Sequence, residues 1–143
     1  MNLKKKSMLK AISVAALAAI AFTGCGQNGG QTLEKEKPYQ PGEKLKLGFA
    51  YIGPVGDAGW SFTHDEARRA IEKKFGDKIE TFFVELADPS SDGPRVLKSL
   101  ADNGNHMIFG TTFGYAPSIK ALSEQYPNIK WEHANGSYVS KNI

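Results

Sequence analysis

The sequence predicts an open, doubly wound α/β sheet that is mostly parallel. From residue 45 onward, short apolar runs alternate with amphipathic stretches, and the runs begin roughly 20 to 35 residues apart, the length of one βαβ unit. The runs are almost continuously apolar, as expected for parallel strands that helices cover on both faces. The chain has 143 residues, of which 41% are apolar, an ordinary fraction for one globular domain.

Four apolar runs are predicted as strands, and they span residues 45–52, 79–84, 107–109 and 129–131. The first carries Phe49 and Tyr51, and the second carries Phe82 and Phe83. Because strands of this kind are buried on both faces, we expect these aromatic side chains in the interior.

The first predicted helix follows the first strand. Thr63 and Glu66 have the spacing of a capping box, which predicts a helix start at Thr63. Apolar residues then recur at three- and four-residue spacing, which predicts one buried helix face. The residues of that face are Ala67, Ala70, Ile71 and Phe75.

Two further helices are bounded by residues that typically start or end a helix. The second is predicted after Ser91, with Pro94 in its first turn and Gly104 as its stop. The third begins near Pro117 and ends at 126–127, where Tyr precedes Pro. Their apolar faces are Val96, Leu97, Leu100 and Ala101 in the second, and Ile119 and Leu122 in the third.

The first 24 residues are predicted to be a lipoprotein signal peptide. Four lysines lie in the first ten residues, and an uncharged apolar run at 11–22 follows, too short for a spanning helix. Small residues directly before Cys25 predict that this cysteine is lipidated and holds the protein on the extracytoplasmic face of the cell membrane. The alternative is an ordinary secretory signal followed by an incidental thiol. Residues 25–43 are polar and rich in Gly and Pro, which predicts a flexible tether before the folded part at 44–143.

Charge and cysteine content exclude two classes of protein. Without the predicted signal peptide, fourteen Lys and Arg face fifteen Asp and Glu, so nucleic acid binding through bulk positive charge is not expected. A disulfide framework is excluded because Cys25 is the only cysteine.

Ligands of such sheets bind outside the carboxyl ends of the strands. The candidate loops are residues 53–60, 87–91, 112–115 and 135–138. In the first loop, Asp57 suits the hydroxyl or N–H donors of a neutral ligand, or alternatively caps the next helix. Trp60 and Phe62 either stack on a planar ligand or anchor that helix in the core.

The third loop places an aromatic residue on each side of a glycine. Gly114 allows a left-handed turn, so that Phe113 and Tyr115 would both face the crevice and clamp a flat group. Core packing of one of the two rings is the alternative.

Several motifs together resemble the basic membrane lipoprotein family. They are the leader with Cys25, the strand at 46–52 with the Gly53–Trp60 loop and His64-Asp65, and the segments 104–109, 111–115 and 131–136. Members of that family are type I periplasmic-binding-protein-like receptors of ABC importers, similar to purine nucleoside receptors. The resemblance implies a receptor that closes two lobes on a purine nucleoside or base and delivers it to an ABC permease. It also implies that these residues form only the N-terminal lobe.

Two other classes compete with a receptor. An enzyme on a Rossmann-like sheet would need a nucleophile with its base or a metal cluster, but no G-x-S-x-G motif is present and His64, His106 and His133 are scattered. We therefore expect no catalytic residue, metal or cofactor. A surface sensor or antigen with a protein partner would need an extended charge run or an exposed amphipathic helix, and the sequence offers neither.

Overall fold

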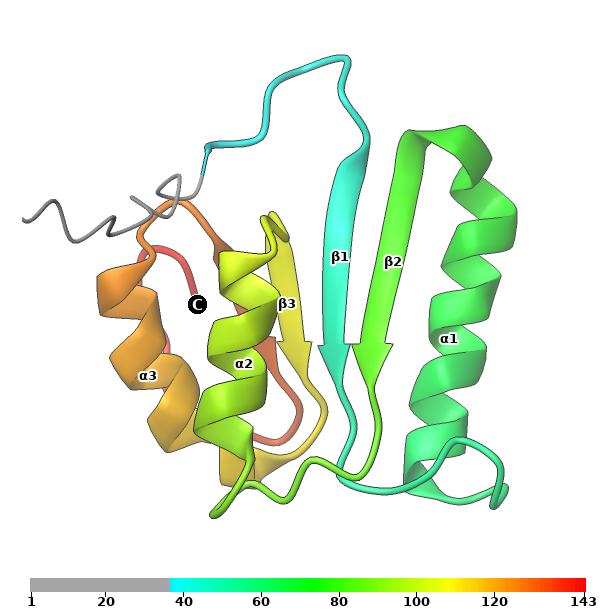
Figure 1. The fold of residues 1–143 in the computed structure, drawn as a ribbon, viewed down its shortest axis with the longest axis vertical. Helices are drawn as coiled ribbons and strands as arrows, with labels where there is room; N and C mark the ends of the chain where they lie inside the picture. The colour runs from blue at the N-terminus through cyan, green and yellow to red at the C-terminus, as the bar shows by residue number, and fades with distance from the viewer. Residues whose placement is uncertain (1–36) are drawn as a thin grey trace, which may run out of the picture. The chain divides into compact units, whose positions relative to one another are not determined.

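The computed structural model describes residues 37–143, which form a four-stranded, all-parallel sheet flanked by helices (Figure 1). The predicted α/β class is confirmed. The predicted signal peptide, Cys25 and the tether up to residue 36 lie outside the described residues. In chain order, the elements are β1 Leu45–Ala50, α1 Trp60–Phe75, the 3-10 turn η1 Gly76–Lys78, β2 Ile79–Val84, α2 Gly93–Asp102, β3 Met107–Gly110, the 3-10 turn η2 Phe113–Tyr115, α3 Ala116–Gln125 and β4 Lys130–His133.

The strand order is β2-β1-β3-β4, so the first strand of the chain lies inside the sheet. Phe49 of β1 is in register with Phe83 of β2 on one side and with Phe109 of β3 on the other. Phe109 is in turn level with Glu132 of β4. The strands therefore begin together at one edge and end together at the opposite edge, as Figure 1 shows.

The face covered by α2 and α3 contains the main core. Leu97 of α2, Ile108 of β3 and Ile119 of α3 are completely buried, and Trp131 of β4 packs with them. The predicted buried faces of both helices are therefore confirmed. Burial of a large aliphatic side chain stabilises the fold by about 1.5 to 3 kcal/mol, so this cluster is the main apolar contribution to stability.

The face covered by α1 is only partly filled. The rings of Phe49 and Phe109 stack with centroids 4.6 Å apart and planes 6° from parallel. Beside them lies a largely apolar groove of about 280 Å³, between α1 and β4. Ala67 and Ile71 form its helix wall, and Glu132 lines its other side. Within residues 37–143, one helix covers this face, so one side of the groove is open to solvent.

The predicted start and buried face of α1 are wrong. The helix begins at Trp60 after Gly59, and Thr63 Oγ1 donates to the Gly59 carbonyl at 3.1 Å, so no capping box forms. The buried residues of α1 are Ser61, Asp65 and Arg68, whereas the predicted apolar face is half-buried or exposed. The Asp65–Arg68 ion pair is thus the most buried contact of the helix with the sheet, and Ile71 packs only partly against the strands.

That ion pair is a buried polar network. Asp65 Oδ1 accepts from Arg68 Nε and Asp65 Oδ2 accepts from Arg69 Nε, both at 2.7 Å, while the Tyr51 hydroxyl donates to Asp65 Oδ1 at 3.3 Å. Burial alone would raise the pKa of Asp65, but the hydrogen bonds from the two arginines outweigh it and lower that pKa. Arg68 also lies 4.7 Å from the centroid of the Phe83 ring. The network fixes α1 against β1 and β2.

The other boundaries follow the sequence with small differences. Pro94 lies in the first turn of α2, and Gly104 has a φ of +75°, as its predicted role as helix stop requires. The first strand ends two residues before the prediction, at Ala50. Phe82 and Phe83 were expected inside but are 39% and 41% exposed, because β2 is an edge strand of the sheet.

The described end of the predicted tether carries a turn. Glu43 N donates to the Gln40 carbonyl at 3.2 Å, and the Tyr39 ring packs edge-on against His106 at 5.6 Å. Within residues 37–143, none of the helices has the length and apolar character needed to cross a bilayer.

Candidate functional site

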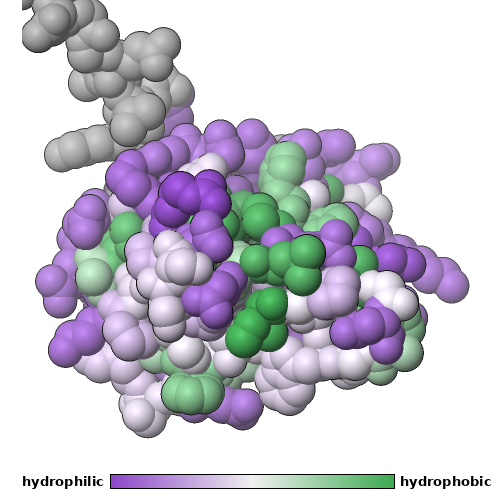
Figure 2. Space-filling view, turned by 60° about the horizontal axis from the view of Figure 1, so that its bottom comes forward, coloured by the Kyte–Doolittle hydropathy of each residue, from purple (hydrophilic) through white to green (hydrophobic). Residues whose placement is uncertain are grey.

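The loops that follow the four strands meet at one edge of the sheet because all strands are parallel. We call this surface the carboxyl edge and define it as residues 51–60, 85–93, 111–116 and 134–138. Figure 2 brings it toward the viewer and shows hydrophobic surface gathered among hydrophilic residues. The exposed large apolar side chains in these loops are Ile52, Trp60, Leu86 and Phe113.

Backbone strain is concentrated at the carboxyl edge. In the part of the chain that the structure describes, the non-glycine residues with positive φ are Ala58 at 56°, Leu86 at 55° and Asn135 at 61°. Each lies in a different loop of this edge. Such conformations cost free energy and persist where the surrounding structure holds them, which is typical of ligand sites.

The first loop is fixed by hydrogen bonds to the neighbouring elements. Gly53 N donates to Ser61 Oγ at 3.0 Å, and Val55 N donates to the Glu85 carboxylate at 2.6 Å. Asp57 is exposed, and its Oδ1 accepts from Gly59 N at 2.8 Å. Because Gly59 itself has no side-chain cap, Asp57 shapes the turn before α1 and is not a helix cap. Its carboxylate remains available to a ligand.

Trp60 is held in place while half of its surface stays exposed. Its Nε1 donates to the Thr111 carbonyl at the end of β3, at 2.7 Å, and its exposed fraction is 50%. His64 packs edge-on against the indole with centroids 4.9 Å apart, and burial lowers the pKa of His64. The indole thus spans from α1 to β3 and presents a positioned aromatic surface beside the carboxyl edge.

The third loop differs from the expected aromatic clamp. Residues 113–115 form a 3-10 turn, and Gly114 does not have the predicted left-handed conformation. Its missing side chain instead allows close packing, because a Cβ there would lie 2.9 Å from Pro89 Cβ. Phe113 is 69% exposed, whereas Tyr115 is fully buried and its hydroxyl donates to the Ala87 carbonyl.

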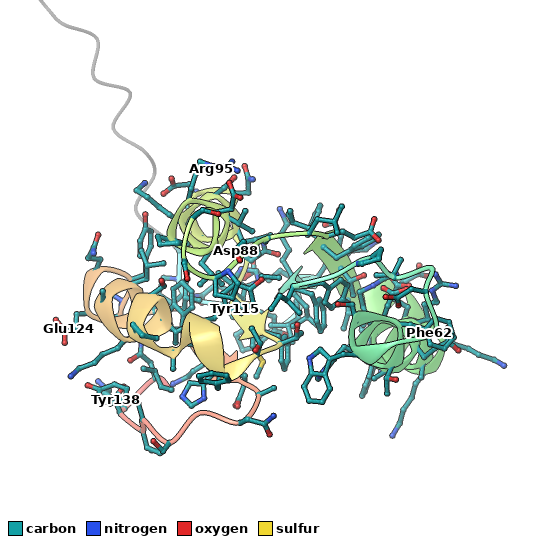
Figure 3. The ribbon with its side chains drawn as sticks, turned by 90° about the horizontal axis from the view of Figure 1, so that it is seen from below. Phe62, Asp88, Arg95, Tyr115, Glu124 and Tyr138 are labelled. Atoms are coloured by element: carbon teal, nitrogen blue, oxygen red, sulfur yellow. The ribbon has the colours of Figure 1, made fainter. Side chains whose placement is uncertain are left out.

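The two rings therefore have different roles. Burial raises the pKa of Tyr115 to about 12. This side chain lies beneath the loops of the carboxyl edge and binds the Ala87 carbonyl there. Phe113 is the ring that a ligand could reach. Phe62 is half-buried on α1, and Figure 3 shows it apart from Asp88 and Tyr115, which lie together at the centre of the edge.

The fourth loop depends on a glycine. His133 Nε2 lies 2.9 Å from the Tyr138 carbonyl, so the loop folds back over the imidazole. A Cβ at Gly136 would lie 1.7 Å from His133 Nδ1, which no side chain could tolerate without a large shift. This explains the glycine of the Asn135-Gly136 pair at this position.

The charge of the carboxyl edge is entirely negative. It carries Asp57, Glu85, Asp88 and Asp92 and neither Lys nor Arg, although Arg95, just beyond these bounds, pairs with Asp92 at 2.9 Å. Asp88 accepts from Ser90 N at 2.9 Å and from Ser91 N at 3.0 Å, and these bonds hold its pKa below the usual range. An edge of this kind suits a neutral or cationic ligand with hydrogen-bond donors and repels an anionic one.

The exposure of two residues of the edge has no sequence signal. Ile52 was predicted as the last residue of a buried strand but is 40% exposed after β1, and Leu86, which belongs to no motif, is 66% exposed with a left-handed backbone. Residues 37–143 contain no group of three His, Cys, Asp or Glu side chains arranged to hold a metal ion.

The four-stranded parallel sheet flanked by helices is a fold that ABC transporter solute-binding proteins also have. Residues 44–143 match the family model Bmp, described as ABC transporter substrate-binding protein PnrA-like, and the chain belongs to that family. The family expected from the motifs is therefore confirmed.

Two curated relatives are much longer than this chain. A purine-binding protein of Brucella abortus (strain 2308) is 44% identical over 101 residues, which cover 71% of this chain and 29% of that protein. A protein named as an ABC transporter glucose-binding protein, from Haloferax volcanii, is 40% identical over 102 residues, which cover 71% of this chain and 26% of the relative. The chain thus spans less than a third of either relative.

Solved structures share the fold. A solute-binding protein of an ABC transporter system from Conexibacter woesei superposes with a TM-score of 0.54 at 16% identity, over 61% of this chain and 28% of that one. A transcriptional activator of the comK gene from Bacillus halodurans gives 0.59 at 23% identity, over 68% of this chain and 32% of that one. At these identities the likeness concerns the fold alone.

Proposed function

We propose that this chain is the ligand-facing N-terminal lobe of an ABC importer receptor that binds a purine nucleoside or purine base. The observation that carries the proposal is the positioned indole of Trp60 beside a carboxylate-bearing, cation-free edge. Membership of the substrate-binding family and the purine-binding relative support it. The proposed role is binding and delivery to a permease, with no catalytic step and no cofactor.

The proposed ligand contacts follow from what each side chain offers. The exposed indole of Trp60 stacks on one face of a flat base, and Phe113 covers a second apolar surface. The Asp57 carboxylate accepts hydrogen bonds from a ribose hydroxyl or a base N–H. Tyr115 acts indirectly, because it is buried beneath the edge. Phe62, which is half-buried on α1, contributes to the packing of that helix more than to ligand contact.

We also propose that Cys25 carries a lipid and that the lobe works on the extracytoplasmic face of the cell membrane. The motif at residues 22–25 is the basis for this part. A Cys25→Ser variant should leave the processed membrane fraction and appear soluble or unprocessed. Retention of a processed serine variant in the membrane would contradict the anchor.

The ligand proposal is tested by fluorescence titration with inosine, adenosine and guanosine, with glucose as the competing class. One lobe leaves half of a ligand in water, so we expect binding near millimolar, about −4 kcal/mol. Trp131→Phe removes the buried indole, so that the signal comes from Trp60. Saturation by glucose but by none of the nucleosides would overturn the ligand class.

Asp57→Asn provides the residue-level test. Loss of the charged acceptor should weaken nucleoside binding about tenfold or more. Asp77→Asn is the matched control, because it removes an exposed carboxylate from the opposite end of the sheet. If both variants bind alike, Asp57 only shapes its turn.

A further inference from the structure

The two ends of the sheet differ in charge. We call the end where the strands begin the amino edge and define it as residues 37–46, 73–80, 102–106 and 125–130. It carries seven lysines and four carboxylates, whereas the carboxyl edge carries four carboxylates and no cation. The lobe is therefore electrically polar along its strands. Near a charged surface, such a distribution favours one orientation.

Part of the negative charge at the amino edge is already paired. Glu43 lies 3.4 Å from His106 Nε2 and accepts from Gln40 N at 2.6 Å. Asp102 accepts from Lys98 Nζ and from the Tyr126 hydroxyl, both at 2.6 Å. Asp102 is thus paired with a cation, whereas Glu43 is held by hydrogen-bond donors, and the seven lysines of the edge outnumber its four carboxylates.

Three of the lysines lie close together at the end of α1. Lys73, Lys74 and Lys78 are exposed, and they also complement the negative end of the helix dipole. That dipole accounts for cations at a helix C-terminus but not for Lys44 and Lys46, which lie at the start of the adjacent strand. The positive charge therefore extends across the edge.

Exposed aromatic side chains accompany the lysines. Phe75 is 44% exposed, and Lys74 Nζ lies 5.5 Å from its ring centroid. Tyr39 is 43% exposed at the described start of the chain. Lysines beside exposed aromatic rings are typical of surfaces that rest at a membrane interface. A hollow of about 550 Å³ on the same edge has a lining of mixed charge, with Lys44 and Lys46 on one hand and Glu43, Glu80 and Asp102 on the other.

The chain enters the lobe on this edge. Residues 37–44 lead into β1 at the end of the sheet opposite the ligand loops (Figure 1). Only eleven residues lie between Cys25 and Lys37, so a lipid on Cys25 can lie at most about 40 Å along the chain from the amino edge.

We propose that the amino edge docks on an anionic phospholipid surface while the lobe awaits its ligand, so that the carboxyl edge faces away from the bilayer. Delivery to the proposed permease then requires the lobe to leave this surface. The inference rests on the proposed location of the lobe beside a membrane. Attraction acts on the lysines of the amino edge, and repulsion acts on the carboxylates of the opposite edge. Phe75 and Tyr39, which are exposed on the amino edge, reach the headgroup region.

The test is amine-reactive labelling, read lysine by lysine by mass spectrometry. The full chain is reconstituted into vesicles of phosphatidylcholine alone, or of phosphatidylcholine and phosphatidylglycerol in equal parts. On the anionic vesicles, Lys73, Lys74 and Lys78 should be labelled about threefold more slowly, and about 1 M salt should remove the difference. Lys120 of α3, which packs against Tyr138 near the other edge, should be labelled equally on both.

Two variants of equal charge sharpen the result. The pair Lys73→Gln and Lys74→Gln should abolish the protection of Lys44. The pair Arg95→Gln and Lys120→Gln, which removes the same charge away from the amino edge, should leave it unchanged. Equal labelling on both kinds of vesicle, or protection of Lys120 as well, overturns the docking surface. The proposed anchor is read separately from the membrane retention of the Cys25→Ser variant, so either idea can fail alone.

Discussion

The two faces of the sheet are built in opposite ways. On the α2 and α3 side, apolar side chains of two helices and three strands form a continuous buried cluster. On the α1 side, one helix packs through the Asp65–Arg68 pair, and the stacked Phe49 and Phe109 rings lie beside an open groove. The first face is held by apolar area, and the second by a few directed polar contacts.

This difference predicts which substitutions destabilise the lobe most. Apolar packing is spread over many contacts, so the loss of one side chain leaves a cavity that neighbours partly fill. A buried ion pair is different, because removal of one partner leaves an unpaired charge. The position of the carboxyl-edge residues depends on both faces. Trp60 is the first residue of α1, which the ion pair holds, whereas Gly114 and Tyr115 lie on the apolar side.

Asp65→Ala should have the largest effect. It removes the anion that binds Arg68 Nε, Arg69 Nε and the Tyr51 hydroxyl, while Glu72 still lies 2.8 Å from Arg68 Nη1. We therefore expect a loss of about 3 to 4 kcal/mol in the free energy of unfolding, at the lower end for a broken buried pair, measured by urea titration. Glu66→Ala is the control, because that exposed neighbour should matter by less than about 0.5 kcal/mol. Similar losses for the two variants would show that the ion pair does not hold the α1 face.

The next comparison truncates one aliphatic side chain on each face. Leu97→Ala, in the filled core, should cost about 3 kcal/mol. Ile71→Ala, in the wall of the open groove, should cost about 1 kcal/mol, because that side chain is only half-buried. Chemical denaturation of both variants gives the ratio. Equal costs would mean that the α1 face is packed as tightly as the other.

The α1 face should also weaken first in acid. Because the folded pKa of Asp65 lies below its unfolded value, its contribution to stability is present above about pH 4 and is lost as the pH falls through the folded pKa. Urea midpoints at a series of pH values should fall less steeply in Asp65→Asn than in the wild type. Parallel slopes would assign the acid loss to other carboxylates.

The smallest effect is expected at Thr63, near the start of α1, where Ser61 provides the comparison. Thr63→Ala should change stability by less than about 0.5 kcal/mol, because Thr63 caps nothing. Ser61→Ala should cost about 1 to 2 kcal/mol, because the buried Ser61 Oγ accepts from Gly53 N. The melting temperatures of the two variants test this order. A larger loss for Thr63→Ala than for Ser61→Ala would show that Thr63 caps the helix.

Periodic apolar patterns predicted the strands and α2 and α3 well, because burial there is decided by side-chain hydrophobicity. The face of α1 was not predictable in this way, since Asp65 and Arg68 become buried only through each other and Tyr51. The orientation of Trp60 depends on a carbonyl 51 residues away. Gly114 has a tight contact with Pro89, which a local turn rule does not contain. The sequence therefore predicted which loops form the candidate site, but not the orientation and exposure of the aromatic side chains in them.

The central position of β1 also constrains how the lobe acquires its structure. This strand is the first to leave the ribosome, yet its partners Ile79 and Met107 follow Leu45 and Leu47 by 34 and 60 residues. Parallel pairs over such separations close long loops before they gain contacts, which slows folding. A nascent chain that stops short of β3 leaves one side of β1 unpaired. The lobe should consequently fold after synthesis of most of its length, as a polypeptide that crosses a membrane unfolded would require.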